Sequence, residues 1–484
     1  MNDSNNNNNG FKKSFSWRRQ IIINGIDAYD VLSLKTSSDI SKKSWIEMLH
    51  GLEYSIQIKN KKSKIIWLIF IVIAVFISIY LTVITINEFF EDKTVTLNTI
   101  RRKNEILYHG ISICPKYSDT FNYINVKNKI LSIRNDLDNK TINDLIIYAL
   151  AGGGFDNYNN LIKDFHSNKS YELDNILNDI IIYFGSLKNF YNYIFEEENF
   201  KCEDFFEECI FGNDVLNCCE LFQPAFVLIR GKCYKLKKIY QRDPDEISKL
   251  RLVLKPLSSI FLNNNKSQEQ LVIYNSPRSE SIGLFPRYYI HNKDWNRFRF
   301  TKRMYKLFHN KGNCNNDKNY KGLSICYTNG WIKQKIHDKF NCTFFYINNN
   351  QFNLPICSPK IIVENYEEIM TNKPIKINCN QACTREEVET TLITKPFSST
   401  LANIKDYSNP KIHIEMSYER LQEYIFEDVL VTTASGFISE LGGHTGLFVG
   451  FTIITIIQAL FFLVRYIFKE FSKMKLENVN GVKF

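Results

Sequence analysis

The stretch GGHTGLFVGFTIITII, residues 442–457, decides the fold class, because its glycines recur at the start of a long apolar run. Gly442, Gly446 and Gly450 are four residues apart, so a helix would carry them on one face. In lipid, small residues let helix backbones approach closely. The spacing therefore indicates either a plain helix-packing stripe, or helices that meet around a water-filled axis and expose backbone carbonyls to it.

Two uncharged segments, residues 65–86 and 446–464, are each long enough to cross a bilayer, which takes about 20 apolar residues. The first begins too far from the N-terminus for a signal peptide, and it lacks a small-residue cleavage site. Lysines precede it, carboxylates follow it, and Arg465 and Lys469 follow the second segment. Since positive charge stays on the cytosolic side, we predict that both termini are cytosolic and that the long intervening segment is extracellular.

The cysteines support this orientation, because all 12 lie between the two apolar segments. An even set confined to one segment is typical of disulfides formed in an oxidising compartment, whereas the paired C-x2-C spacing of a zinc site is absent from the sequence. The predicted disulfide residues are Cys114, Cys202, Cys209, Cys218, Cys219, Cys233, Cys314, Cys326, Cys342, Cys357, Cys379 and Cys383. Glycosylation sequons in the same segment begin at Asn139, Asn168, Asn265 and Asn341.

Composition divides the chain into cytosolic, membrane and extracellular parts. The polar N-terminus contains an NNNNN tract and is predicted to be disordered. The predicted parts are a disordered cytosolic N-terminus (1–43), a cytosolic pre-membrane segment (44–64), a first transmembrane helix (65–86), an extracellular cysteine-rich domain (87–441), a second transmembrane helix (442–468) and a cytosolic C-terminus (469–484).

Local patterns predict several elements of the extracellular domain. Apolar residues at helical spacing indicate an amphipathic helix within residues 172–200. Residues 270–274 and 411–416 are predicted strands, and the cysteine-dense stretch 202–233 is predicted to be irregular. Thr384 and Glu387 fit the spacing of a capping box at a helix start.

Motifs of catalysis and nucleotide binding are absent from the sequence. It contains no H-E-x-x-H, G-x-S-x-G, G-x4-G-K-[ST] or G-x-G-x-x-G, and its 8 histidines are far apart. The net charge is +10, but the basic residues are scattered and form no nucleic-acid footprint. We therefore predict a protein that is not an enzyme, with no cofactor, no metal site and no nucleic-acid partner. An ectoenzyme whose residues converge only in space stays an alternative.

Residues 439–457, SELGGHTGLFVGFTIITII, resemble the second transmembrane signature of the degenerin / epithelial sodium channel / acid-sensing ion channel superfamily. In that signature a Gly-Gly pair precedes G-L-F/W-x-G-x-S and an apolar run. NCCELFQPAFVLIRGKCY, residues 217–234, is similar to a cysteine block of the arthropod pickpocket branch. The motif His50-Gly51, GISICP at residues 110–115, the Cys379–Cys383 spacing and residues 413–428 also match, so the resemblance extends, with gaps, from about residue 44 to residue 468.

The resemblance implies a trimeric cation channel that is sodium-permeable, amiloride-sensitive and located in the plasma membrane. Its fold would be two transmembrane α-helices flanking a large disulfide-rich α+β ectodomain, with a β-sheet core and peripheral helices. Its partners would be sodium ions, the lipid bilayer and related subunits in a homo- or hetero-trimer. An extracellular stimulus, whether a ligand, a proton or a mechanical force, would open it.

The resemblance also assigns residues. Gly450, Phe451 and Thr452 take the place of the selectivity filter, with threonine where the family has serine. The pore and gating positions are Gly442, Gly443, Gly446, Ser435, Gly436, His50 and Gly51. Gln458 stands where many members carry a carboxylate, and glutamine brings no fixed charge to attract cations. A non-conducting accessory subunit is therefore the main alternative, and an ATP-gated two-span channel is a weaker one.

Overall fold

The computed structural model describes residues 54, 58–165, 167–276, 278, 283–308, 314–347, 354–370, 377–396 and 411–450, together with 452, 454, 455, 457, 460, 461, 463–465, 467 and 468. The chain divides into two compact units. We call residues 1–93 with 432–484 the helical unit, and residues 94–431 the disulfide domain. The predicted ectodomain bounds, 87–441, stay a prediction; one helix continues to Phe90 and another begins at Ala434.

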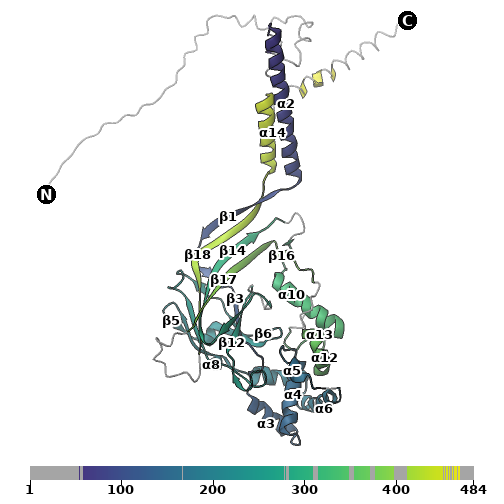
Figure 1. The fold of residues 1–484 in the computed structure, drawn as a ribbon, viewed down its shortest axis with the longest axis vertical. Coiled ribbons are helices and arrows are strands. Elements are labelled where there is room, and N and C mark those ends of the chain that lie inside the picture. Colours follow the sequence, from purple (N-terminus) through teal and green to yellow (C-terminus); the bar gives the residue numbers. More distant parts are fainter. Residues whose placement is uncertain are drawn as a thin grey trace, which may run out of the picture. The chain divides into compact units, whose positions relative to one another are not determined.

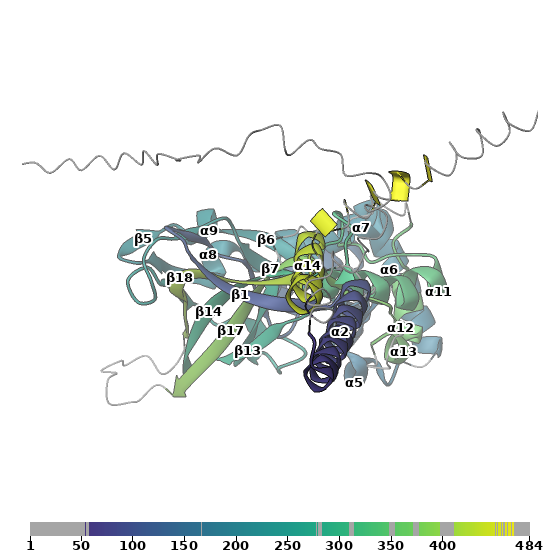
Figure 2. The ribbon, with the colours of Figure 1, turned by 90° about the horizontal axis from the view of Figure 1, so that it is seen from above.

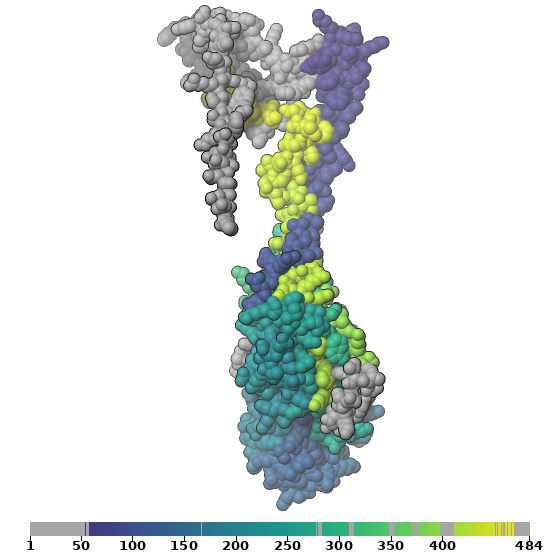
Figure 3. Space-filling view, turned by 90° about the vertical axis from the view of Figure 1, so that its left-hand side faces the viewer, coloured from purple at the N-terminus to yellow at the C-terminus, as the bar shows by residue number. Residues whose placement is uncertain are grey.

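The helical unit contains α2 (Lys61–Phe90) and α14 (Ala434–Val449), which lie side by side (Figure 1 and Figure 3). Within the described part of the chain, α2 is the helix long and apolar enough to cross a membrane. Its buried side chains are the hydroxyl residues Ser78 and Thr85, whereas Phe76 and Tyr80 are two-thirds exposed. In lipid, a helix is expected to turn its polar residues toward a neighbouring helix and its apolar residues outward. The second predicted span includes residues outside the described part and stays a prediction.

The larger sheet of the disulfide domain is seven-stranded, in the order β17-β14-β18-β9-β4-β5, with β1 also paired to β18. The first part of β18 pairs with β9 and its last part with β1, both antiparallel, while β14 runs parallel along its other edge. The strands are β1 (Thr94–Arg102), β4 (Phe206–Phe211), β5 (Asp214–Leu216), β9 (Leu250–Leu254), β14 (Asp294–Lys306), β17 (Thr384–Pro396) and β18 (Ile412–Leu430).

A second, five-stranded sheet is antiparallel throughout, in the order β13-β12-β3-β7-β6. Its strands are β3 (Gly110–Pro115), β6 (Phe222–Val227), β7 (Gly231–Leu236), β12 (Gln270–Ser276) and β13 (Arg287–His291). Ile111 and Ile273 of this sheet pack in one buried apolar cluster with Leu252 and Met416 of the larger sheet. Short two-stranded ribbons complete the strands: β2 (Ile106–Leu107) with β8 (Tyr240–Gln241), β10 (Ser258–Ser259) with β11 (Lys266–Ser267), and β15 (Cys314–Asn315) with β16 (Gln381–Ala382).

Most helices of the disulfide domain gather to one side of the sheets (Figure 2). They are α3 (Tyr123–Ile133), α4 (Asn139–Gly152), α5 (Asn159–Ile162), α6 (Ser167–Phe184), α7 (Leu187–Asn192), α8 (Cys202–Phe205), α9 (Cys218–Leu221), α10 (Leu323–Ile332), α11 (Asp338–Phe340), α12 (Pro359–Glu364) and α13 (Tyr366–Met370), with π-helical turns η2 (Tyr193–Glu197) and η3 (Lys333–His337). They enclose a second apolar core, in which Leu145, Leu177 and Phe195 are fully buried.

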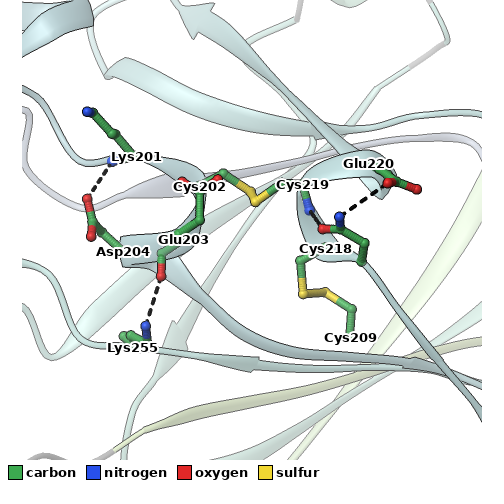
Figure 4. The surroundings of a disulfide bond; sticks show 10 residues. Lys201, Cys202, Glu203, Asp204, Cys209, Cys218, Cys219, Glu220 and Lys255 are labelled. Atoms are coloured by element: carbon green, nitrogen blue, oxygen red, sulfur yellow. Dashed lines mark hydrogen bonds between the residues drawn. A yellow bond between two sulfur atoms is a disulfide. The ribbon is translucent and has the colours of Figure 1, made fainter.

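All predicted disulfide residues are paired, and the chain has no free cysteine. The pairs are Cys114–Cys233, Cys202–Cys219, Cys209–Cys218, Cys314–Cys383, Cys326–Cys379 and Cys342–Cys357. Cys218 of α9 is bonded to Cys209 of β4, and the adjacent Cys219 is bonded to Cys202 of α8 (Figure 4). The two disulfides therefore hold α8, α9 and β4 together. Lys255 of the neighbouring chain segment donates to the carbonyl of Glu203 at 2.8 Å and holds the same corner.

The predicted strands at 270–274 and 411–416 are confirmed in β12 and β18. The amphipathic helix predicted within 172–200 is confirmed in α6, which buries Leu173, Ile176 and Leu177. It ends at Phe184, where Gly185 adopts a φ of 77° before α7 begins. The capping box at Thr384 is also wrong, since this residue begins β17. Residues 202–233 contain short helices and strands where irregular chain was predicted, because the disulfides hold each turn to its neighbour.

Candidate functional site

Helix α14 starts with a capped first turn. The hydroxyl of Thr433 accepts a hydrogen bond from the backbone N–H of Gly436 at 3.1 Å, and it also lies 3.1 Å from the hydroxyl of Ser435. A Cβ atom on Gly436 would come within 3.2 Å of that threonine oxygen. The predicted gating positions Ser435 and Gly436 are therefore part of the cap itself, so a large side chain at Gly436 would press on the start of the helix.

Polar side chains join α14 to α2. The hydroxyl of Ser78 donates to the carbonyl oxygen of His444 at 3.4 Å, and the hydroxyl of Thr85 lies 3.3 Å from His444 Nε2. Nearer the start of α14, the rings of Phe437 and Phe89 stack with centroids 4.3 Å apart. These contacts between α2 and α14 were not predicted from the sequence. A sequence signal for the polar ones exists: a histidine lies inside one apolar run and hydroxyl residues lie inside the other.

The glycine face of α14 does not pack against α2. A Cβ atom placed on Gly442 or Gly443 would meet no atom within 4 Å, so neither glycine serves a close contact between these helices. The side of α14 that faces α2 is the one that carries His444 and Phe437. Among the described residues, the space beside Gly442 and Gly443 is therefore open to a neighbour outside this pair of helices.

The helix ends at Val449, and Gly450 is its C-cap in the left-handed conformation, with φ 71° and ψ 21°. Its N–H donates to the carbonyl of Gly446 at 3.1 Å. Gly450 thus keeps the helical bond to Gly446, while its own left-handed conformation ends the helix. A helix end leaves its last carbonyl groups without helical donors, and these carry the negative end of the helix dipole.

Thr452 starts a second helical stretch. The N–H of Thr455 donates to the hydroxyl of Thr452 at 3.3 Å, and the N–H of Thr452 donates to the hydroxyl of Thr455 at 3.2 Å. This reciprocal pair is the arrangement of a capping box, with threonine in place of the usual glutamate. Ile454, Thr455 and Ile457 are helical. The T-x-x-T spacing is present in the sequence, but it could be recognised as a helix cap only once the preceding helix was known to end before Gly450.

The site therefore consists of a helix C-terminus, a left-handed glycine and a threonine-capped restart, with no carboxylate between Gly442 and Arg465. Such an end attracts a cation through carbonyl oxygens and the helix dipole. Glu440 is the acidic residue of α14, and it is exposed. The predicted residues His50, Gly51 and Phe451, and also Gln458, lie outside the described residues. The predicted glycosylation residues Asn139, Asn168, Asn265 and Asn341 are all exposed, and their modification stays a prediction.

A buried charge network crosses the larger sheet at β14 and β18. The side chain of Arg297 is 4% exposed and contacts three carboxylates: Asp245 at 2.6 Å, Glu415 at 3.4 Å, and Glu246. Lys249 completes the network with a 3.0 Å contact to Glu415. Because each buried charge has a partner, the cost of removing it from water is offset. The network thus joins the loop before β9 to the centre of the sheet.

His109, which follows β2, is a buried histidine, and we expect it to make the stability of the disulfide domain depend on pH. Burial lowers the pKa of this imidazole to about 3, so the folded domain keeps it neutral while the unfolded chain protonates it near its ordinary value of about 6.5. The unfolded state then binds the extra proton, and the free energy of unfolding falls by about 1.4 kcal/mol for each pH unit below that value. We expect it to be about 2 kcal/mol lower at pH 5 than at pH 7.

Denaturant unfolding of the purified protein at both pH values measures this effect. His109→Gln should remove most of the difference between the two pH values, while His291→Gln, at an exposed histidine of β13, should leave it intact. An equal pH dependence in wild type and His109→Gln would contradict the assignment.

The described residues thus combine an apolar membrane-length helix, a disulfide domain, and a helix end that presents carbonyl oxygens. Residues 48–462 match the model of the family "Amiloride-sensitive sodium channel". The chain therefore belongs to this family, which lies in the degenerin / epithelial sodium channel superfamily, and its members are plasma-membrane ion channels rather than enzymes. The suspected family is confirmed, while the pickpocket branch is untested.

A search of curated proteins finds no match. Among solved structures, the chain is similar to one described as "Cryo-EM structure of a proton-activated chloride channel", with a TM-score of 0.31 and 8% sequence identity. The match covers 83% of this chain and 97% of that chain. At this TM-score the likeness carries no argument about function.

Proposed function

We propose that this protein is a subunit of a trimeric, sodium-permeable and amiloride-sensitive cation channel with two membrane spans, opened by an extracellular stimulus. The observation that carries the proposal is the interruption of α14 at Gly450, within the apolar run that the sequence assigns to the second span. Irregular backbone at membrane depth is stable only where it lines a cavity or is buried in protein. An interruption at this place is therefore expected to line a water-filled path.

The open glycine stripe supports assembly with other subunits. In one chain, Gly442 and Gly443 have free space where a Cβ would stand, although small residues in a lipid-embedded helix usually serve close helix contacts. Copies of α14 around a common axis would fill this space. The interruption at Gly450 would then place carbonyl groups from each copy near the axis.

The same geometry supports a cation as the permeant ion. The C-terminus of α14 carries partial negative charge, which supplies the attraction that Gln458 does not. The hydroxyl of Thr452 already accepts a bond from Thr455 N–H, so it holds the restart of the helix in place. We propose Gly450, Phe451 and Thr452 as the narrow part of the path, with Ser435 and Gly436 at its outer end.

Orientation follows from the charge pattern around the spans, and it agrees with the disulfides. The N-terminal and C-terminal segments would be cytosolic, with His50 and Gly51 at the inner end of the path. The disulfide domain would be extracellular, where its cysteines are oxidised. Asn139, Asn168, Asn265 and Asn341, all exposed, would be available for glycosylation.

Voltage clamp of cells expressing this chain alone tests the proposal. We expect an inward current with sodium outside, lost when an impermeant cation replaces sodium, and reduced by amiloride. Gly436→Phe should enlarge the current, because the new side chain presses on the Thr433 cap at the start of α14. Gly443→Phe is the matched control on the same helix, placed in open space within one chain, and it should block assembly rather than enlarge the current.

The accessory-subunit alternative gives a different result. Trimers at the cell surface without current in wild type and in Gly436→Phe would overturn the proposal of a homomeric pore. Current that appears only after co-expression with a related subunit would assign this chain to a heteromer. The sequence has no carboxylate between Gly442 and Arg465 that could attract cations, and this is the reason to test the accessory-subunit alternative.

A further inference from the structure

The disulfide domain contains a cavity of about 840 Å³ beside the first turn of α10, at the junction of β2, β12, β16 and β17. Its wall is mixed: Leu107, Phe285 and Val388 are apolar, while Arg278, Lys321 and the start of α10 bring positive charge or N–H groups. Cavities of this size that combine apolar walls with a few convergent polar groups are typical of small-molecule sites. None of these residues belongs to the site at the end of α14.

The first turn of α10 is open to an anion. Its N-cap is Gly322, at a φ of 101°, so no side chain caps the helix, and its first turn contains no acidic residue. Gly322, Leu323 and Ser324 all line the cavity. A helix N-terminus carries partial positive charge and unpaired N–H groups, which favour a bound anion.

Arg278 brings a full positive charge to the same wall. Its Nε donates to the carbonyl of Tyr108 at 2.7 Å and its Nη2 to the carbonyl of Lys237 at 3.2 Å. These bonds fix the guanidinium, yet among the described residues it has no carboxylate partner. Burial lowers the pKa of Arg278, which shows that its charge is poorly solvated there.

The acids of the cavity form ion pairs with other cations, although Glu386 also opposes the lowering of the Arg278 pKa. Glu386 pairs with Lys302 at 2.7 Å, and Glu387 pairs with Arg385 at 2.5 Å. Lys321, next to the helix start, has no carboxylate partner among the described residues. The wall therefore keeps an excess of positive charge around the start of α10.

Two deeply buried polar groups of the lining also lack partners. His109 Nε2 and the hydroxyl of Ser276 are sealed from solvent without a hydrogen bond, and their residues are 9% and 3% exposed. A buried polar group without a hydrogen bond costs about 1–3 kcal/mol. Both residues line the cavity, so its deep end contains polar groups with unused hydrogen-bonding capacity.

We propose that this cavity binds a small organic carboxylate, with its carboxylate between Arg278, Lys321 and the start of α10, and its apolar body against Leu107, Phe285 and Val388. The site takes one ligand in each disulfide domain. It lies wholly within that domain and is complete without a second copy.

Thermal unfolding of the full-length protein in detergent tests the proposal with benzoate as the probe. Benzoate should raise the unfolding midpoint along a saturable curve, because a ligand that binds only the folded state stabilises it. Benzamide, which has the same body without the charge, should leave the midpoint unchanged. Acetate, which has the charge without the body, should act only at concentrations at least tenfold higher than benzoate.

Variants locate the effect. Arg278→Gln keeps a donor for the neighbouring carbonyls but removes the charge, and it should abolish the benzoate shift. Arg242→Gln is the matched control, because Arg242 is 78% exposed and outside the cavity lining, and it should respond like wild type. If Arg278→Gln fails to fold, Lys321→Gln replaces it, and the benzoate concentration at half-saturation should rise about tenfold.

An equal shift with benzamide, an unchanged benzoate response in both cavity variants, or no saturable shift in wild type would overturn the proposal. The readout is unfolding and not current, so a chain that proves silent under voltage clamp would leave this test valid. A positive result would then justify applying benzoate to the extracellular side during current recording.

Discussion

Replacing Gly450 by valine is expected to abolish the sodium current of the proposed channel, while the disulfide-bonded chain still reaches the cell surface. Gly450 has a φ of 71°, a conformation that costs an L-residue roughly 1–2 kcal/mol and a β-branched residue more. Valine therefore favours continuation of α14 through this point. The carbonyl groups at the end of α14 and the cap between Thr452 and Thr455 would then lose their positions.

Whole-cell current together with surface labelling measures this effect, and two variants control it. Gly450→Asn should retain current, because asparagine tolerates the left-handed conformation. Gly443→Ala should retain current too, since a Cβ there meets no atom within 4 Å and alanine favours a helix. Wild-type current in Gly450→Val would show that the left-handed residue is dispensable and would remove the main support for the proposed path.

Replacing Arg297 by methionine is expected to lower the free energy of unfolding of the disulfide domain by about 3–5 kcal/mol. The side chain of Arg297 is 4% exposed, and that of its partner Glu415 is 9% exposed. Removing the guanidinium leaves Glu415 buried with Lys249 as its remaining partner, and leaves Asp245 without its closest cation. Since a typical domain is stable by about 5–15 kcal/mol, much of this protein should fail to reach the cell surface.

Denaturant unfolding and surface labelling check this expectation. Arg303→Met provides the control on the same strand, because Arg303 is 34% exposed and pairs with Glu389 at the surface. An exposed ion pair contributes only about 0–1 kcal/mol, so this variant should stay close to wild type. Equal losses in the two variants would show that burial of Arg297 has no special consequence.

The resemblance of residues 439–457 to a known signature indicated the family, and local chemistry was enough to predict the first apolar helix and that every cysteine is in a disulfide. It also located β12 and β18: residues 411–416 alternate apolar and polar side chains, and residues 270–274 form a short apolar run that becomes a buried strand. The disulfide partners stayed open, because spacing along the chain does not say which cysteines meet. Cys218 and Cys219 are adjacent in sequence, yet they are bonded to different partners, Cys209 and Cys202.

Errors arose where a local pattern had two structural solutions. Thr384 and Glu387 fit a helix start, but pairing along the whole of β14 makes this segment a strand. The helix predicted within 172–200 ends earlier than the apolar pattern, because Gly185 has a φ of 77° and the hydroxyl of Ser186 caps the next helix. At Thr384, contacts with a distant strand outweighed the local preference, which contributes only a few tenths of a kcal/mol per residue.

The sequence by itself determined that this chain has a membrane-length helix, a disulfide domain and a glycine-rich segment of the amiloride-sensitive sodium channel family. These features can be recognised from the composition and spacing of residues along the chain, which are local properties. Only the tertiary structure decided that α14 stops at Gly450, that the hydroxyl of Thr452 caps the N–H of Thr455, and that His444 meets Ser78 and Thr85. It alone also brought Arg278, Lys321 and the start of α10 to one cavity, because these residues meet only when separate strands and helices pack.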